Sequence, residues 1–538
     1  MQLSPSAHAD TFCRDNLPPP GRLPDLQFTR PELAYPDRLN CAEALLDQTI
    51  EAHGPHRPCL LSDGATWSYG DLLGRANQVA LVLTEELGLV PGNRVLLRGP
   101  NNPWLAACWL GVVKAGGVVV TTMALLRAME LSAICEIAQV SLALCDHRFI
   151  GELAAASVPG LSIVSYGGDG PGDLRQRAAR QPDGFTAVAT AADDVAMIAF
   201  TSGTTGRPKA AMHFHREVLA TADTFSALVL QPSPDDVFTG TPPLAFTYGL
   251  GGLLIFPLRA GAATLLLEKA TPSELADCIA ARGVTVCSTA PTAYRAMIAA
   301  GKAGQLRGLR SPVSAGEHLS ASTWQAFYDA TAVRIIDGIG STEMLHIFIS
   351  AAGEAIRPGS TGVPVPGYQA AILDDEGKPV PDGEPGRLAV KGPTGCKYLA
   401  DPRQLSYVQD GWNLTGDTYL RDRDGYFWYQ ARSDDIIISA GYNIAGPEIE
   451  EALLMHPDVT ECGVVGVPNE ARGQLVTAYV VLAGGVLGDA AKVAELQAFV
   501  KQKIAPYKYP RAIEFLAELP RTNTGKLQRY RLRQRSGG

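Results

Sequence analysis

The sequence predicts an α/β protein. A large N-terminal domain of layered α/β subdomains, ending in a small β-barrel-like unit, is followed by a small α+β C-terminal domain. Helical patterns alternate with short apolar runs and Gly-rich turns over the first 350 residues, which is typical of parallel α/β layers. The helical patterns disappear between residues 360 and 430, and strands and helices begin again near residue 435. We therefore expect two domains, 1–433 and 434–538.

The elements of the large domain are expected in a regular order. Residues 11–40, rich in Pro and charged side chains, should form an extended arm over the surface. Helix 71–87 is expected before strand 93–99, and helix 104–116 before strand 117–122. The alternation then continues through strand 195–200, helix 215–229, strand 262–267, helix 271–283 and strand 284–290.

The later elements are shorter. Strands 368–374, 386–392 and 426–432 are separated by Gly, Pro and Asp turns and indicate a small antiparallel β unit. The C-terminal domain should contain strands 435–439, 461–468 and 477–482 and helices 447–456 and 490–504.

Composition is that of a globular protein and excludes several functions. Of the 538 residues, 46% are hydrophobic and 19% charged, and the formal net charge is −9. A mildly acidic protein is a poor general nucleic-acid binder. The N-terminus lacks a basic start followed by an apolar run, and prolines interrupt the longest uncharged stretch, 237–258. We expect a cytoplasmic protein without nucleic-acid or membrane partners.

Two further compositional features bear on function. The ten cysteines are scattered, with no two separated by two to four residues, which indicates buried thiols in a reducing compartment and no zinc site. The last 38 residues hold ten Lys and Arg against two Glu. Such a basic tail fits either a nucleic-acid arm or a lid that closes over a polyphosphate.

The most informative stretch directly follows strand 195–200. Its glycines let backbone N–H groups approach an anion, its hydroxyl groups add hydrogen bonds to phosphate oxygens, and its lysine adds positive charge. It cannot be aligned with a Walker A loop, so it indicates another kind of phosphate-binding loop. The residues concerned are Thr201, Ser202, Gly203, Thr204, Thr205, Gly206 and Lys209.

This loop, TSGTTGRPK, resembles the signature of the adenylate-forming superfamily, which includes acyl-CoA synthetases, peptide-synthetase adenylation domains and luciferase-like enzymes. Five more stretches occur in the family's order: PPLAFTYG (242–249), SAGEHL (314–319), GSTE (340–343), TGD with ARSDD (415–417 and 431–435), and PRTNTGK (520–526). Because the six stretches span about 325 residues in the right order, the chain is identified as a member of this superfamily.

The resemblance implies a reaction in two halves. A carboxylate attacks the α-phosphorus of ATP to give an acyl-adenylate, and a thiol then displaces AMP to give a thioester. The first half brings an anion against a triphosphate, so it needs positive charge and a metal more than it needs a base. By resemblance, Glu343 is the Mg²⁺ ligand and Thr342 contacts the α-phosphate. A helix-capping role is the alternative for a Glu that follows Ser-Thr.

The resemblance also assigns the rest of the nucleotide site. Asp417 would accept both ribose hydroxyls, assisted by Arg432. Gly316 and Glu317 would form the edge against which the adenine lies. Asp337 and Gly338 belong to the same site by resemblance.

Three residues of the C-terminal domain receive roles in the same way. Lys526 would reach the forming acyl–phosphate bond and stabilise the transition state. Asp434 matches the family's hinge, about which the small domain is expected to rotate. Gly441 would line the channel for pantetheine, because a residue without a side chain leaves room for it.

The acid pocket is expected between residues 244–252 and the segment after Glu343. The two stretches around it resemble benzoate- and 2-aminobenzoate-CoA ligases. Plain core packing is the alternative for these side chains. The pocket residues assigned in this way are Phe246, Tyr248, Ile339, Gly340 and His346.

The chain departs from the family in two places. Ile339 stands where a tyrosine often stacks on adenine. Ser439-Ala440-Gly441 replaces the usual Lys/Arg-x-Gly step after the hinge. Contacts with the nucleotide and on that loop are therefore expected to differ from the family's pattern.

The resemblance implies a ligase that uses ATP, Mg²⁺ and coenzyme A to activate a small-molecule aryl carboxylate. Three alternatives share the motifs: an adenylation enzyme that loads a carrier protein, a ligase for a non-aromatic acid, and a luciferase-like oxygenase. A non-catalytic nucleotide sensor is the alternative from another class, and it should lack Lys526, Glu343 or Lys209, all of which are present. The sequence leaves the oligomeric state open, a homodimer included.

Overall fold

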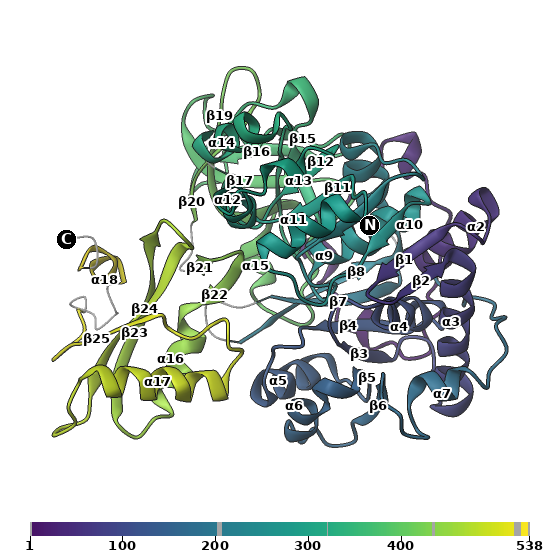
Figure 1. Ribbon diagram of the computed structural model, residues 1–538, viewed down its shortest axis with the longest axis horizontal. Helices are drawn as coiled ribbons and strands as arrows, with labels where there is room; N and C mark the ends of the chain where they lie inside the picture. Colours follow the sequence, from purple (N-terminus) through teal and green to yellow (C-terminus); the bar gives the residue numbers. More distant parts are fainter. Residues whose placement is uncertain (1–2, 202–206, 320, 433–435, 521–528, 536–538) are drawn as a thin grey trace.

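The computed structural model describes residues 3–201, 207–319, 321–432, 436–520 and 529–535. It contains a large unit with three sheets, and a smaller unit with a fourth sheet beside it (Figure 1). Within the described residues, no helix is long and apolar enough to cross a membrane.

The first sheet has six strands in the order β6-β5-β3-β4-β7-β8. Its pairs are parallel except β7 with β8, which are antiparallel. Its strands are β3 (Arg94–Arg98), β4 (Val118–Thr122), β5 (Leu142–Asp146), β6 (Ser162–Tyr166), β7 (Val195–Thr201) and β8 (Lys209–Phe214). The helices of this part of the chain are α1 (Phe12–Asp15), α2 (Gln48–His53), α3 (Tyr69–Leu81), α4 (Pro103–Lys114), α5 (Ala128–Ala138), α6 (Ile150–Ala155), α7 (Leu174–Ala178) and α8 (His215–Thr221).

The second sheet has nine strands in the order β15-β14-β13-β12-β11-β9-β10-β1-β2. Its strands are β1 (Pro58–Ser62), β2 (Ala65–Ser68), β9 (Val237–Gly240), β10 (Ala263–Leu265), β11 (Val286–Thr289), β12 (Ser311–Ser314), β13 (Ile336–Gly340), β14 (Ile347–Ser350) and β15 (Val363–Pro364). The helices between them are α9 (Thr247–Leu250), α10 (Phe256–Ala260), α11 (Pro272–Ala281), α12 (Pro291–Ala299), α13 (Ala303–Leu306) and α14 (Ala321–Thr331).

The third sheet is the antiparallel unit expected from residues 360 to 430. Its strands are β16 (Gln369–Leu373), β17 (Pro385–Lys391), β18 (Val408–Gln409), β19 (Trp412–Arg421) and β20 (Phe427–Arg432). A one-turn helix, α15 (Gln404–Tyr407), interrupts the stretch where no helix was expected. The Asp401 carboxylate accepts the Arg403 N–H just before it at 2.9 Å, and a turn this short leaves no helical periodicity in the sequence.

The small unit is built on β21 (Ile436–Ser439), β22 (Tyr442–Ala445), β23 (Val459–Asn469), β24 (Gly473–Leu482) and β25 (Ala512–Phe515). Its strand order is β22-β21-β24-β23, with β25 parallel to β24. The helices are α16 (Gly446–Leu454), α17 (Ala490–Lys503) and α18 (Arg529–Arg535). A separate apolar core lies between the sheet and helices α16 and α17. Apolar residues recur every second position in its strands and about every 3.6 positions in its helices, so each element has one apolar face to bury.

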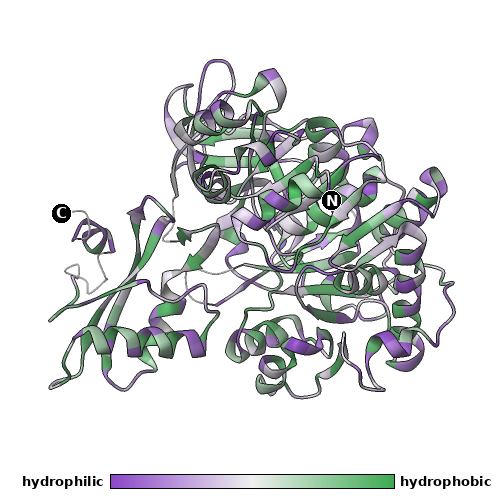
Figure 2. Ribbon diagram, in the orientation of Figure 1, coloured by the Kyte–Doolittle hydropathy of each residue, from purple (hydrophilic) through white to green (hydrophobic). Residues whose placement is uncertain are grey.

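Apolar residues concentrate on the strands inside each unit, while polar residues face outward on the helices (Figure 2). The N-terminal arm is attached to this core, because Cys13 is buried and Asp10 forms an ion pair with Arg94. All ten cysteines are free, and every one except the partly exposed Cys278 is buried, as the sequence predicts.

Candidate active site between the two domains

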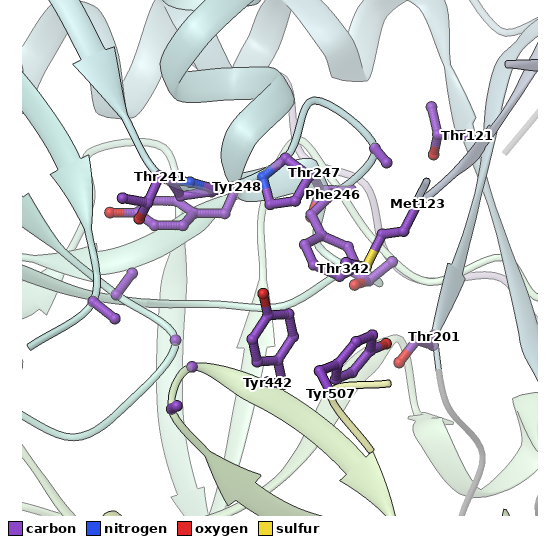
Figure 3. A pocket seen from close by; sticks show the side chains of 18 of the residues that line it. Thr121, Met123, Thr201, Thr241, Phe246, Thr247, Tyr248, Thr342, Tyr442 and Tyr507 are labelled. Atoms are coloured by element: carbon purple, nitrogen blue, oxygen red, sulfur yellow. The ribbon is translucent and has the colours of Figure 1, made fainter. Parts of the chain in front are cut away.

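A cavity of about 570 Å³ lies where the small unit meets the large one. Its wall includes residues at the carboxyl ends of β7, β9, β11 and β12, the edge where parallel sheets place ligand sites. Figure 3 shows Phe246, Tyr248 and Thr342 on one side of the cavity and Tyr442 and Tyr507 on the other. Of the predicted site residues, Thr201, Phe246, Tyr248, Gly316, Gly340, Thr342, His346 and Gly441 line it.

The predicted phosphate and metal residues lie close together. Thr201 and Thr342 both line the cavity. Lys209 opens β8, and its Nζ is 3.8 Å from Oε1 of the buried Glu343 carboxylate. This pair places one cation and one carboxylate next in sequence to, or in the same loop as, the threonines that line the cavity. A carboxylate oxygen here fits Mg²⁺, which is held by one or two protein carboxylates together with substrate phosphates.

Two tyrosines behind Glu343 are functional candidates that the sequence did not indicate. The Tyr398 hydroxyl donates to Glu343 Oε1 at 2.5 Å, and burial raises the pKa of that phenol well above its usual value. Tyr407 stands edge-on to Tyr398 and lies 3.3 Å from the Ser341 hydroxyl. The Glu343 carboxylate is therefore held in one place from behind.

The same segment also holds the end of the phosphate-binding loop. The Arg403 guanidinium donates to the backbone carbonyls of Arg207 and Pro208 at 2.9 and 3.2 Å. Asp401 pairs with Arg403 and fixes its direction. Nothing in the one-dimensional pattern of residues 397–407 predicts these contacts, because their partners are distant in sequence.

The predicted adenine edge is covered by the small domain. Gly316 follows β12 with φ +88°, and Gly441 stands opposite with φ +81°, so both take a conformation that favours glycine. A Cβ on Gly441 would lie 3.7 Å from Glu317 Oε1. The Thr292 hydroxyl donates to the same oxygen at 3.4 Å, and burial raises the pKa of Glu317.

The remaining predicted nucleotide residues lie on two strands. Asp417 on β19 pairs in register with Arg432 on β20, and the Arg432 side chain is outside the described part. Asp337 and Gly338 lie on β13, and burial raises the pKa of Asp337 to about 8. The Asp337 carboxyl is thus held largely uncharged near neutral pH.

The predicted acid pocket contains an aromatic box. The His346 ring lies 4.5 Å from Phe256, 5.5 Å from Phe225 and 5.6 Å from Tyr248, centroid to centroid. Burial lowers the pKa of His346 to about 3, so the imidazole is neutral. Gly251 touches the ring, since a Cβ there would lie 2.3 Å from His346 Cδ2. Phe225 and Phe256 were not expected from the sequence.

Hydroxyl groups stand beside this box. Thr241 and Thr289 line the cavity with their hydroxyl oxygens 2.6 Å apart. The Tyr248 hydroxyl donates to the Val313 carbonyl at 3.2 Å. The structure places Ile339 outside the cavity wall, paired with Ile349 and packed against the core, and Gly340, Ser341 and Thr342 form the wall there.

Several predicted residues lie outside the described part of the chain. They are Ser202, Gly203, Thr204, Thr205, Gly206, Asp434 and Lys526.

The small domain contributes a second wall that the sequence did not indicate. Tyr442 and Tyr507 stack with centroids 4.2 Å apart and line the cavity, together with Glu448 and Lys508. In the sequence, Lys508 is distinguished only as one charge of the basic tail.

The chain is similar to known proteins over nearly its whole length. Residues 46–398 match the AMP-binding enzyme family, and residues 448–526 match the AMP-binding enzyme C-terminal domain. A benzoate–CoA ligase of Thauera aromatica is 34% identical over 519 residues, which cover 95% of this chain and 98% of that protein. A 4-hydroxybenzoate–CoA/benzoate–CoA ligase of Rhodopseudomonas palustris is 33% identical over 514 residues, covering 93% and 94%.

Solved structures show the same likeness. The anthranilate CoA ligase AuaEII in complex with anthranoyl-AMP has a TM-score of 0.74 at 33% identity, covering 94% of this chain and 99% of that one. The amide bond synthetase McbA of Marinactinospora thermotolerans has a TM-score of 0.83 at 26% identity, covering 92% and 99%. These structures confirm the predicted fold class of a large α/β domain followed by a small C-terminal domain.

Proposed function

The chain belongs to the family of AMP-binding enzymes, and from that premise we propose that it is an AMP-forming ligase joining an aryl carboxylate to coenzyme A. The resemblance drawn from the sequence motifs is thereby confirmed. Relatives named for benzoate and 4-hydroxybenzoate, and a structural neighbour that holds anthranoyl-AMP, support an acid of the benzoate or 2-aminobenzoate type. ATP and coenzyme A are both supplied in the cytoplasm, where we place the reaction.

In the first half-reaction a carboxylate oxygen bonds to the α-phosphorus of ATP. The bond from that phosphorus to the bridging oxygen breaks, and pyrophosphate leaves with the electron pair. Thr342 and Lys209 would bind phosphate oxygens, and Lys526 would stabilise the charge that develops in the transition state. Glu343 would hold Mg²⁺, which supplies further positive charge against the triphosphate.

In the second half-reaction the sulfur of coenzyme A bonds to the acyl carbon. The bond from that carbon to the AMP oxygen breaks, AMP leaves, and the thiol proton passes to solvent. The small domain in its described position supports this step. Gly441 faces Gly316, and Tyr442 and Tyr507 form a wall that an extended thiol chain would pass.

One observation carries the choice of an aryl acid. Tyr248 and His346 line the same cavity as Thr342, and Phe225 and Phe256 pack against the His346 ring. A flat ring gains contact with such walls, whereas a flexible chain loses rotamer entropy on entering them.

The experiment is a screen of pyrophosphate release over benzoate, 2-aminobenzoate, other aryl acids, hexanoate and octanoate, with and without coenzyme A. We expect higher kcat/KM for the aryl acids, and formation of their CoA thioesters. Equal efficiency with the fatty acids would favour a ligase for non-aromatic acids. Adenylate formation without thioester would favour an enzyme that loads a carrier protein. A sizing column run beside the screen tells a monomer from a homodimer.

A further inference from the structure

A buried cluster of charges joins the two domains. Lys508 of the small domain donates to Oε1 of Glu130, on α5 of the large domain, at 2.6 Å. The same Nζ donates to both carboxylate oxygens of Glu448, on α16, at 2.6 and 2.9 Å. Glu130 is the member of the cluster that the large domain supplies.

Every member of this cluster is buried. The exposed fractions are 7% for Glu130, 9% for Glu448 and 6% for Lys508. Glu130 Oε2 also accepts the backbone N–H of Ala505 in the small domain at 3.0 Å. Because a buried charge needs a partner, the complete cluster specifies the one domain orientation that brings its members together.

The described orientation places one particular surface of the small domain over the cavity. Tyr442, Tyr507 and Lys508 all line it, and Gly441 lies against the predicted adenine edge. This surface is the one through which a thiol would reach an acyl-adenylate.

The described residues on either side of 521–528 pack on another face of the small domain. Leu519 and Leu532, which stand on either side of residues 521–528, both pack against Val465 and Val467 of β23. The alternate residue Val464 packs instead in the core with α16 and α17, so the two leucines lie on the other face of the sheet. Helix α18 lies at the far end of the small domain, away from α5 (Figure 1). The role at the reacting phosphate that the resemblance gives Lys526 is expected in a second orientation of the small domain.

We propose that Glu130 is a positioning residue for the second half-reaction: its contact with Lys508 holds the small domain in the orientation that admits the thiol, and it plays no part in forming the adenylate. This inference rests on the proposed function. When the small domain rotates, Lys508 keeps Glu448, because both belong to the small domain, but it loses Glu130. The cluster with Glu130 thus exists in one orientation only.

The test measures the two half-reactions separately on the full-length enzyme. Pyrophosphate release reports adenylate formation, and transfer of chemically prepared benzoyl-AMP to coenzyme A reports the second step. Glu130→Gln should leave kcat and the KM for ATP of the first step within twofold of wild type. It should lower the rate of transfer at least tenfold.

Glu152→Gln is the matched control. Glu152 accepts from Arg127 at 2.6 Å and from the Ala128 N–H at 3.1 Å, so its ion pair lies near α5 but within the large domain. Its loss should leave both steps unchanged.

We call the contact between Glu130 and Lys508 the latch. Exchanging its two charges distinguishes loss of this ion pair from simple loss of packing. Glu130→Lys and Lys508→Glu should each impair transfer at least tenfold, and the double variant should recover most of the loss, since it restores one ammonium facing two carboxylates. Circular dichroism confirms that each variant is folded.

Each outcome decides the proposal. Three results would overturn the latch while leaving the ligase function intact. They are equal losses in both steps in folded Glu130→Gln, unchanged transfer in that variant, and a double variant that is no better than the single variants. Wild-type enzyme that forms adenylate but transfers nothing to coenzyme A would overturn the proposed acceptor and the latch together.

Discussion

Replacing Gly251 by alanine would test whether His346 forms a wall of the acid pocket. Gly251 has helical φ and ψ of −61° and −58°, so alanine meets no backbone strain there and is the better helix former. Its Cβ would lie 2.3 Å from His346 Cδ2 and 2.7 Å from Nε2. Ordinary contact between such atoms is about 3.5 Å, so the ring must move by roughly 1 Å.

The ring has little room except toward the cavity. Phe256 and Phe225 lie 4.5 and 5.5 Å away, and His346 itself lines the cavity. Overpacking of this kind costs about 1–3 kcal/mol. Because the ring relieves it by moving into the cavity, the acid must push the ring back on binding, and about 1–3 kcal/mol lost there lowers kcat/KM for benzoate roughly 5- to 150-fold. The KM for ATP should not change, because the displaced ring belongs to the acid pocket.

The assay is pyrophosphate release at varied benzoate and varied ATP, with thermal unfolding of each variant. Gly74→Ala on α3 is the matched control, since its Cβ would lie 3.6 Å from Asp183 Cβ in ordinary contact. A folded Gly251→Ala enzyme with wild-type kcat/KM for benzoate would refute the assignment of His346 to the pocket.

Three further predictions concern the other walls of the site. Tyr398→Phe removes the hydrogen bond to Glu343, and a hydrogen bond to a charged group contributes about 1.5–3 kcal/mol. The Mg²⁺ concentration for half-maximal pyrophosphate release should therefore rise at least tenfold, while the temperature of thermal unfolding changes little. Gly441→Leu should slow transfer to coenzyme A but spare adenylation, whereas Gly425→Leu, at φ +87° with open space around it, should spare both. Burial raises the pKa of Glu448 to about 7; the nearby Glu130 carboxylate contributes to this rise, and Lys508 opposes it. The Tyr507 phenol also faces this cluster. Protonated Glu448 therefore favours the described orientation below pH 7, so transfer should decline relative to adenylation as the pH rises through 7, and a constant ratio from pH 6 to 8 would contradict this.

The parts of the site that could be predicted are those that follow strands. Thr201 ends β7, Gly316 follows β12 and Thr342 follows β13, so alternation of strands and helices already brings these residues to one edge of the sheets. The motifs then indicate which of the residues at that edge carry chemistry. The helix–strand order was predicted for the same reason, because period 3.6 and apolar runs are local properties of the chain.

The parts that could not be predicted depend on contacts between distant segments. Tyr398 becomes important only because its segment lies beside β8, through a bridge between Tyr398 and Ala211, and so reaches Glu343, 55 residues away in sequence. The contact between Glu130 and Lys508 spans 378 residues. None of these three residues has a local sequence pattern that distinguishes it from an ordinary buried tyrosine or an exposed charge.

The burial of the cysteines has a practical consequence for the chemistry of this enzyme. Burial raises the pKa of thiols such as Cys135, to about 11, so few of them are thiolates at neutral pH, and among the ten only Cys278 is partly exposed. A colorimetric thiol reagent added to the folded protein should therefore report at most one reactive group per chain. The free sulfhydryl of coenzyme A can then be measured as it is consumed, with almost no background from the protein. A sudden rise in the number of reactive protein thiols toward ten per chain would mark unfolding of the chain.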